Sequence, residues 1–186
     1  MSNHRSAVLI AAALGLWLAL PPRAMTGGPH ASDPVVVRVA GPDTLAAFYA
    51  ARYGIDPELA GTIHRLAMEN GLEPAAVFGL IATESRFDAR AIGQSGALGL
   101  MQIKPSTARA YDPHVTRERL FNPEINLRVG LSHLRRELTH FGHDWTLGLL
   151  SYNMGRARLS RALSRGVVPR NGYASKVLAH CGKLCT

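Results

Sequence analysis

Apolar residues along most of the chain recur every three or four positions, the spacing that places them on one face of an α-helix. Examples are Leu59, Ile63 and Leu66 in one segment, and Leu127 and Leu131 in another. Short stretches with Gly, Pro, Asn or Asp separate these segments and mark turns and helix ends. The pattern predicts helices over residues 43–54, 57–70, 74–84, 105–111, 123–141, 145–153, 156–164 and 172–180. The predicted domain is therefore all-α.

Start and stop signals agree with these helices. Asp56-Pro57-Glu58 and Asn122-Pro123-Glu124 each provide a capping side chain, a proline at the first helical position and an early acid. Asp144 and the pair Asp43-Thr44 are further candidate caps, and Asn70-Gly71 is a typical helix stop. Local capping chemistry and periodicity thus predict the same elements.

One predicted helix is apolar along nearly its whole length and ends in a glutamate. Glu84 shares a face with Val77, Leu80 and Ile81. A carboxylate on an apolar face is costly unless it is paired or neutral, and desolvation favours the protonated form that an acid catalyst needs near neutral pH. The helix alone leaves a structural alternative open, in which Glu84 pairs with Arg86 or turns to solvent.

A glycine-rich loop follows this helix. Gly93, Gly96 and Gly99 lie within seven residues, and glycine allows a tight backbone path and the close approach of a ligand. Gln102 then offers an amide that can donate and accept hydrogen bonds. The spacing is not that of a dinucleotide or phosphate loop, and no Lys-Ser/Thr pair follows it, which argues against nucleotide binding.

Length and composition agree with one helical domain in a chain of 186 residues. Apolar residues make up 47% and aromatic residues only 6%, and a mixture rich in Ala and Leu favours helix over strand. The formal net charge of +8 suits an anionic partner such as nucleic acid, an acidic membrane surface or a cell-wall polymer. Charge alone does not choose among these partners.

The first 24 residues have the pattern of a secretory signal peptide. A start with the single cation Arg5 is followed by an apolar run at 7–20 and by Pro21-Pro22. The run is shorter than the ~20 residues of a membrane span, and an uncleaved anchor is the alternative. No cysteine follows the run, which excludes a lipoprotein anchor. We expect an exported protein of the periplasm or cell envelope, with a signal peptide over 1–24, a linker over 25–42, the main domain over 43–180 and a tail over 181–186.

The two cysteines, Cys181 and Cys185, both lie near the C-terminal end. In an oxidising exported compartment they can form a small disulfide loop, although four-residue spacing on an intact helix is poor geometry and Gly182 would have to break the helix. His133, His140 and His143 could suggest a metal site, but no acid or cysteine completes the set, and we expect no metal.

Several motifs in order resemble the catalytic domain of the soluble lytic transglycosylases, within the lysozyme-like superfamily. Glu84-Ser85 is followed by GALGLMQI at 96–103, PSTA at 105–108, NPEINL at 122–127 and Ser151-Tyr152-Asn153, which matches the family's Ala-Tyr-Asn motif. Tyr173 follows, near Lys176. The resemblance covers residues 70–180, and the order of the motifs makes it specific. The main domain is then the catalytic domain.

The resemblance implies a lysozyme-like (goose-type) helical fold with a groove beside Glu84 for the glycan strands of peptidoglycan. The implied reaction cleaves the β-1,4 bond between N-acetylmuramic acid and N-acetylglucosamine and forms a 1,6-anhydromuramoyl product. Glu84 serves as acid and then as base, and no cofactor is needed. The implied substrate-binding residues are Ser85, Met101, Gln102, Tyr152, Asn153 and Tyr173. For Met101 and Tyr152, core packing is the structural alternative.

A single catalytic glutamate is compatible with the remaining acids. Most glycosidases use two carboxylates about 5–10 Å apart, but no second motif surrounds the nearest acids, which are Asp88, Asp112, Glu118 and Glu124. A lone glutamate fits a mechanism in which the acetamido group of the substrate helps to stabilise the positive charge.

The chain departs from the family pattern at two positions. Gly93 stands nine residues after Glu84, where many members carry a serine that contacts the substrate, and Ser95 lies close by. Ser151 replaces the alanine of the Ala-Tyr-Asn motif, and we expect this small-for-small change to matter little.

Other functions fit less well. A helix-turn-helix DNA-binding module would use Ala67, Gly71 and Val77, but its second helix carries no cation before Arg86, and the exported start argues against nucleic acid. A hydrolytic muramidase of the same fold and a wall-binding protein without activity are closer alternatives.

The expected partner is peptidoglycan, and we expect a monomer. The small chain without an added domain favours a role beside a secretion or pilus apparatus over general wall turnover. The basic stripe that runs from Arg156 to Lys176 is interpreted as a solvated face, with attraction to the carboxylates of peptidoglycan stem peptides as the alternative.

Overall fold

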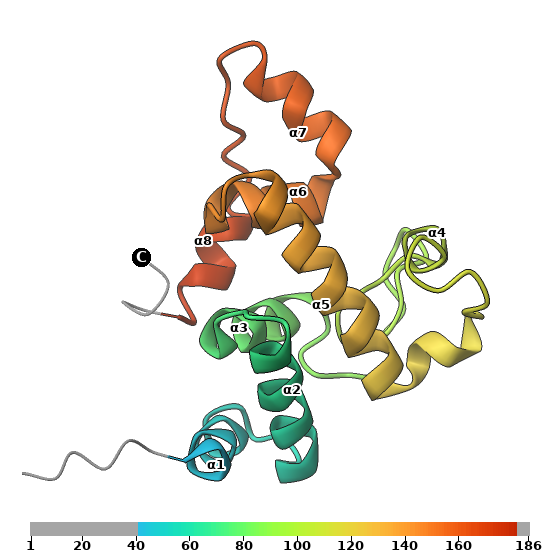
Figure 1. The fold of residues 1–186 in the computed structure, drawn as a ribbon, viewed down its shortest axis with the longest axis vertical. Coiled ribbons are helices and arrows are strands. Elements are labelled where there is room, and N and C mark those ends of the chain that lie inside the picture. The colour runs from blue at the N-terminus through green and yellow to red at the C-terminus, as the bar shows by residue number, and fades with distance from the viewer. Residues whose placement is uncertain (1–40, 182–186) are drawn as a thin grey trace, which may run out of the picture. The chain divides into compact units, whose positions relative to one another are not determined.

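The computed structural model describes residues 41–181, which form eight α-helices and one 3₁₀ helix without a β-strand in that range. The helices are α1 (Pro42–Tyr53), α2 (Pro57–Glu69), α3 (Pro74–Glu84), α4 (Pro105–Ala108), η1 (Glu118–Phe121), α5 (Pro123–His140), α6 (Trp145–Met154), α7 (Arg156–Leu163) and α8 (Tyr173–Leu178) (Figure 1). The all-α prediction is confirmed. The predicted signal peptide, nearly all of the linker and Cys185 lie outside the described residues.

Three of the four predicted capping sites are confirmed by their hydrogen bonds. The carboxylate of Asp56 accepts from the backbone N–H of Leu59 (3.0 Å), the side chain of Asn122 from Ile125 (3.1 Å) and Asp144 from Leu147 (2.9 Å). Each cap satisfies an N–H group that the first turn of a helix leaves without a partner.

The first helix differs from the prediction in its start and in its buried face, since the spacing predicts that Leu45, Phe48, Tyr49 and Arg52 share one face. It begins at Pro42 with Gly41 at the N-cap and no capping side chain, because proline at the first position already has a helical φ. Ala46, Tyr49 and Ala50 are buried, whereas Phe48 is 53% exposed. The ring of Tyr49 stacks on Phe78 of α3 with centroids 4.1 Å apart, and the small alanines let α1 approach its neighbour.

The helix that carries Glu84 runs through the core. All eight residues of α3 from Pro74 to Ile81 are buried, as expected for a helix that is apolar on every side. Helix α2 packs against α1, α3 and α5, and α8 packs against both α3 and α6 (Figure 1). The last turn of α3 therefore emerges from the core with a fixed direction.

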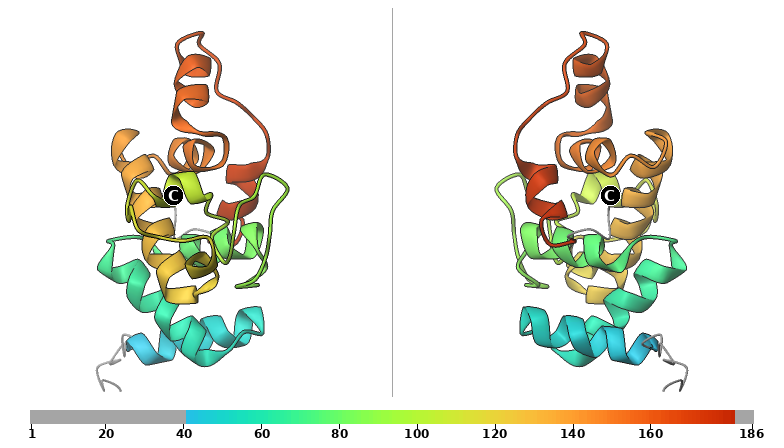
Figure 2. Two further views of the ribbon diagram at one scale, coloured as in Figure 1. Left: turned by 90° about the vertical axis from the view of Figure 1, so that its right-hand side faces the viewer. Right: turned by 90° about the vertical axis from the view of Figure 1, so that its left-hand side faces the viewer.

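Helix α8 lies against α3 at a glycine. A Cβ atom at Gly79 would lie 2.6 Å from the carbonyl oxygen of Val177 and 2.8 Å from Cβ of His180, distances that no side chain tolerates without movement. Gly79 thus permits a close contact between two segments that are about a hundred residues apart in sequence (Figure 2). This contact brings the start of α8 to the end of α3.

The loop between α3 and α4 is ordered by backbone contacts and by one buried amide. Isolated β-bridges join Ile92 to Leu98 and Leu98 to Ile103. The side chain of Asn126 is fully buried; it accepts from the N–H of Met101 and donates to the carbonyls of Leu98 and Leu120, each at 2.8 Å. The motif of residues 122–127 therefore holds the glycine-rich loop in place.

Candidate active site

Glu84 is the last residue of α3, and its side chain is half-buried. The chain turns sharply after it, since Arg86 and Phe87 both have positive φ angles. The hydroxyl of Tyr173 donates a hydrogen bond to Oε1 of Glu84. The described residues show no ion pair between Glu84 and Arg86, the alternative that the sequence had left open, and the carboxyl group faces α8 instead.

The ionisation of Glu84 is shifted by its surroundings. Burial raises the pKa of Glu84 above its ordinary value, and the Tyr173 hydrogen bond and the Lys176 ammonium group only partly oppose this rise. Burial, followed by the negative charge of Glu84, raises the pKa of the Tyr173 phenol well above its ordinary range. Tyr173 therefore stays protonated and remains a hydrogen-bond donor to Glu84.

A groove of about 630 Å³ opens beside Glu84. Its wall is formed by the end of α3, the glycine-rich loop, the start of α4, and parts of α5 and α6. The residues that line it are Glu84, Gly93, Gln94, Ser95, Ala97, Gln102, Ile103, Lys104, Thr107, His133, Tyr152, Asn153, Met154 and Gly155. Glu84 is the only acid among these described residues, so Asp88, Asp112, Glu118 and Glu124 are not part of the wall.

A second hollow, of about 500 Å³, meets the groove at Glu84 and Asn153. Thr83, Asn171, Gly172, Tyr173 and Lys176 complete its lining. Because two hollows share Glu84, the carboxyl group can be reached by a ligand that extends in two directions. This arrangement suits a polymer better than a small molecule.

The groove and the second hollow together form a trough, and Tyr152, Asn153 and Tyr173 of the predicted binding residues line it. The ring of Tyr152 forms part of the groove wall, and its hydroxyl donates to the carbonyl oxygen of Met101 (2.8 Å). Asn153 is exposed at the junction of the two hollows and accepts a hydrogen bond from the Asn171 amide (3.1 Å). The hydroxyl of Tyr152 is thus already satisfied, while the Asn153 amide nitrogen has no hydrogen bond within residues 41–181.

The side chain of Gln102 is partly engaged within the loop. It lines the groove, but its amide nitrogen donates to the carbonyls of Ala91 (3.3 Å) and Gly99 (3.0 Å), and its φ is +50°. Its side chain therefore braces the loop from inside. A Cβ atom at Gly93 would clash with its Oε1 atom, so a side chain at position 93 would require Gln102 to move.

Two of the predicted binding residues do not line the groove or the second hollow. Met101 is fully buried and packs against Gly130 of α5, where an added Cβ would lie 2.8 Å from Cβ of Met101; it belongs to the core and not to the groove wall. Ser85 is the C-cap of α3; its hydroxyl donates to the carbonyl of Ile81 (3.3 Å), and the residue does not line the groove. The predicted disulfide between Cys181 and Cys185 stays a prediction, because Cys185 lies outside the described residues.

Sequence reasoning missed a buried carboxylate beneath the site. Glu137 of α5 is 3% exposed. It accepts from Nε (3.0 Å) and Nη2 (2.6 Å) of Arg156 and from the hydroxyl of Ser151 (2.5 Å), and His133 Nδ1 lies 3.7 Å away. These hydrogen bonds lower the pKa of Glu137 despite its burial. The available signal was its spacing of three from Leu134, on the buried face of α5.

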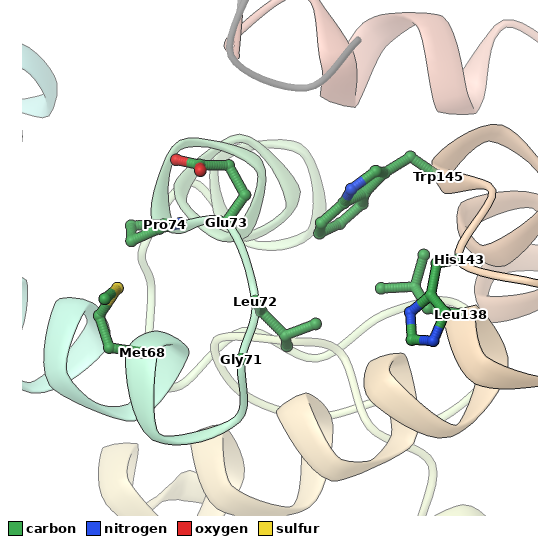
Figure 3. A pocket seen from close by; sticks show the side chains of 8 residues that line it. All are labelled: Met68, Gly71, Leu72, Glu73, Pro74, Leu138, His143 and Trp145. Carbon is green, nitrogen blue, oxygen red and sulfur yellow. The ribbon is translucent and has the colours of Figure 1, made fainter.

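Another hollow, of about 410 Å³, lies between the α2–α3 turn and the start of α6. Figure 3 shows Leu72 and Trp145 pointing toward each other across it. Its one acid, Glu73, caps α3 by accepting from the N–H of Ala75 (3.3 Å). This hollow is therefore a weaker candidate for a catalytic site than the groove at Glu84.

Two further features of the described part of the chain bear on function. Residues 41–181 contain no cluster of three His, Cys, Asp or Glu side chains that could hold a metal ion. Over the same range, no helix combines the length and the hydropathy that crossing a membrane requires.

Comparisons with known proteins agree on one family. The family described as the transglycosylase SLT domain matches residues 61–167. Membrane-bound lytic murein transglycosylase C of Actinobacillus pleuropneumoniae is 32% identical over 79 residues, which is 39% of this chain and 22% of that protein. A protein of Enterobacteria phage PRD1 named transglycosylase is 35% identical over 94 residues, 50% of this chain and 34% of that protein.

A solved structure has the same fold. An inactive mutant of the lytic transglycosylase Slt from Pseudomonas aeruginosa matches with a TM-score of 0.61 at 22% identity, over 79% of this chain and 31% of that one. The predicted lysozyme-like fold is thus confirmed. The chain spans about a fifth to a third of the length of these relatives.

Proposed function

Because the chain belongs to the family of the transglycosylase SLT domain, whose match covers more than half of its residues, we propose that the protein is a lytic transglycosylase of peptidoglycan. It cleaves the β-1,4 bond between N-acetylmuramic acid and N-acetylglucosamine and leaves a 1,6-anhydromuramoyl end. The observation that carries the proposal is a half-buried glutamate with a raised pKa, alone among acids in a trough that extends from it in two directions.

Glu84 performs both proton transfers in this reaction. In its protonated form it donates a proton to the glycosidic oxygen while the bond from that oxygen to muramoyl C1 breaks. The resulting carboxylate takes the proton of the C6 hydroxyl on the same muramoyl residue, and the C6 oxygen closes onto C1. Glu84 ends protonated, no water is consumed, and neither transfer needs a cofactor.

The surroundings of Glu84 suit both steps. Burial favours the proton donor before the reaction. Tyr173 donates to the carboxyl oxygen, and this hydrogen bond becomes stronger once the oxygen is charged. The Lys176 ammonium group adds attraction at the same stage. Tyr173 and Lys176 thus stabilise the carboxylate only partly, and Glu84 remains basic enough to accept the second proton.

The trough provides positions for sugars on both sides of the cleaved bond. Tyr152 offers an apolar wall to a sugar ring, and Asn153 offers an amide at the junction beside Glu84. Gln102 acts mainly through the loop that it braces, and its carbonyl oxygen remains for a sugar hydroxyl or acetamido group. Thr107 and Lys104 add polar groups at the start of α4.

Digestion of purified sacculi tests the proposal. Mass analysis of the released muropeptides should show muramoyl ends that are lighter by one water than the reducing ends a muramidase would produce. E84Q should release no fragments, a loss of at least about a thousandfold, and should unfold at a temperature no lower than the parent at neutral pH. Burial destabilises the ionised form, so removing this ionisation stabilises the fold. Reducing ends would establish the hydrolytic alternative, and absence of release would leave a wall-binding protein.

We also propose that the protein acts in the cell envelope. Relatives are named membrane-bound murein transglycosylases, and the proposed substrate lies outside the cytoplasmic membrane. Residues 1–24 would serve as the signal peptide and 43–180 as the catalytic domain. Mass determination of the protein from the envelope should give an N-terminus at Met25, and an intact Met1 would indicate an anchor.

A further inference from the structure

A hollow of about 650 Å³, which we call the arginine pocket, lies next to the groove. Its lining residues are Tyr111, Ser132, Arg135, Arg136, Thr139, His140 and Arg156. The two hollows adjoin at several points. The hydroxyl of Tyr111 lies 3.0 Å from Nδ1 of His133, which lines the groove. Arg156 directly follows Gly155 of the groove wall.

One arginine of the pocket is held by buried groups. Nε and Nη2 of Arg156 donate to the two carboxylate oxygens of Glu137, at 3.0 and 2.6 Å. Glu137 is itself fixed by the hydroxyl of Ser151. A guanidinium group has five N–H donors, and the two hydrogen bonds to Glu137 leave the others available. The remaining donors stand in the pocket wall at a defined place, which lowers the entropic cost of binding an anion.

The positive charges of the arginine pocket are only partly neutralised by carboxylates of the protein. Glu137 compensates Arg156, but Arg135 and Arg136 are exposed and form no ion pair with any carboxylate of residues 41–181. Hydroxyl groups of Ser132 and Thr139 add neutral donors. Guanidinium forks match the planar geometry of carboxylates. The pocket is therefore built for an anion with more than one carboxylate.

We propose that the arginine pocket binds the carboxylates of the peptide stem that the substrate's muramoyl residue carries. This inference rests on the proposed function, because a glycan strand in the groove would present its stem peptide at the adjoining hollow. The stem contains several carboxylates on a short chain. The pocket thereby selects peptide-bearing strands over bare glycan, and it acts on the affinity for the strand and not on the chemistry at Glu84.

The kinetic experiment compares two substrates and two variants of the full chain. The substrates are glycan strands with stem peptides and the same strands stripped by an amidase. R135Q/R136Q removes two charges from the pocket, and R158Q/R161Q removes two exposed charges from α7 that do not line it. We expect R135Q/R136Q to raise KM about three- to tenfold on peptide-bearing strands, with kcat unchanged and with no change on stripped strands. The control should change neither.

Other outcomes overturn the inference. Equal losses on both substrates, or the same loss in the control, would show that the arginines act only through overall charge. No loss on either substrate would show that the pocket does not contribute to binding of the strand. Binding provides a second readout that does not need turnover. The free tripeptide L-Ala–D-Glu–diaminopimelate should shift the NMR signals of the Arg135 and Arg136 side chains in E84Q, whereas its amidated form should not. Equal shifts with inorganic phosphate would mean a general anion site and would also contradict the proposal.

The same experiments separate a failure of the proposed activity from a failure of the proposed role of the arginine pocket. Should the parent protein release anhydro ends from neither substrate, the proposed function fails, and the tripeptide titration still reports on the pocket. Should it cleave both substrates equally well, with R135Q/R136Q behaving like the parent, only the arginine pocket fails.

Discussion

Opposing effects act on the pKa of the Glu84 carboxyl group. Burial favours its protonated form, while the Tyr173 hydroxyl and the Lys176 ammonium group favour its charged form. An acid that must also act as a base needs a pKa near the working pH, where either state is accessible. The structure provides this compromise with three side chains from two helices.

Tyr173→Phe should change both the rate and its pH dependence. Without the hydroxyl, the carboxylate loses a hydrogen bond, so kcat should fall about tenfold or more. The pKa of Glu84 should rise further because one influence that lowers it is gone. Activity requires the protonated acid, so the alkaline limb of the pH–rate profile should move to higher pH. Tyr53→Phe, whose hydroxyl lies 3.4 Å from Nδ1 of His180, is a matched control. An unmoved limb in Tyr173→Phe would contradict this role.

The departure at Gly93 has a local explanation. A side chain at this position would clash with the side-chain carbonyl oxygen of Gln102 and would require that side chain to move. The glycine therefore allows Gln102 to brace the loop through its amide nitrogen while it also lines the groove. Neighbouring Ser95 lines the same wall, so a hydroxyl remains close to the place where the family often has one.

At the scale of elements, the packing of α8 on α3 assembles the acid and its tyrosine. Gly79→Ala should force these helices apart, since the new methyl group would lie 2.6 Å from the Val177 carbonyl. We expect a loss of about 1–3 kcal/mol in unfolding free energy and a drop in kcat, as Tyr173 withdraws from Glu84. Urea denaturation and sacculus digestion measure the two effects.

Gly61→Ala provides the control for this helix contact. Gly61 lies inside α2 with open space around its Cα, and alanine is the better helix former by about 0.5–1 kcal/mol. The control should gain stability and keep its activity. A Gly79→Ala protein as stable and active as the parent would show that α8 does not depend on this contact.

The buried carboxylate of α5 makes Ser151 more important than the sequence suggested. Its hydroxyl donates to Glu137 in the core, at 2.5 Å. Ser151→Ala should lower the unfolding free energy by about 1.5–3 kcal/mol, the range for hydrogen bonds to charged groups. Ser160→Ala, on the exposed surface of α7, should change it by less than about 0.5 kcal/mol. Equal midpoints for both variants in urea would refute the importance of this hydrogen bond.

At the scale of the whole molecule, local signals predicted more of the fold than of the site. Caps such as Asp56 and Asn122 depend on a few neighbouring residues and could be read directly. The apolar run before Glu84 correctly predicted a helix in the core. By contrast, the buried face of α1 depends on the contact of Tyr49 with Phe78 of α3, which lies far away in the sequence. The 3₁₀ helix η1 is too short to show a periodic pattern of apolar residues.

Long-range contacts account for the errors within the site. Motif membership suggested that Met101 and Ser85 contact the substrate, but such membership does not distinguish a residue that lines a groove from one that supports it. The roles of Asn126 and Glu137 depend on partners up to 28 residues away. The contact of Tyr173 with Glu84 spans 89 residues and could be expected from the family resemblance alone.

The most direct test of the central claim, that Glu84 alone moves both protons and no water attacks, is digestion of sacculi in ¹⁸O-labelled water. The masses of the newly formed muramoyl ends show whether solvent oxygen has been incorporated. We expect ends that lack the label and are lighter by one water than reducing ends, with none formed by E84Q. New ends that carry ¹⁸O at C1 would contradict it, because they would require water as the nucleophile.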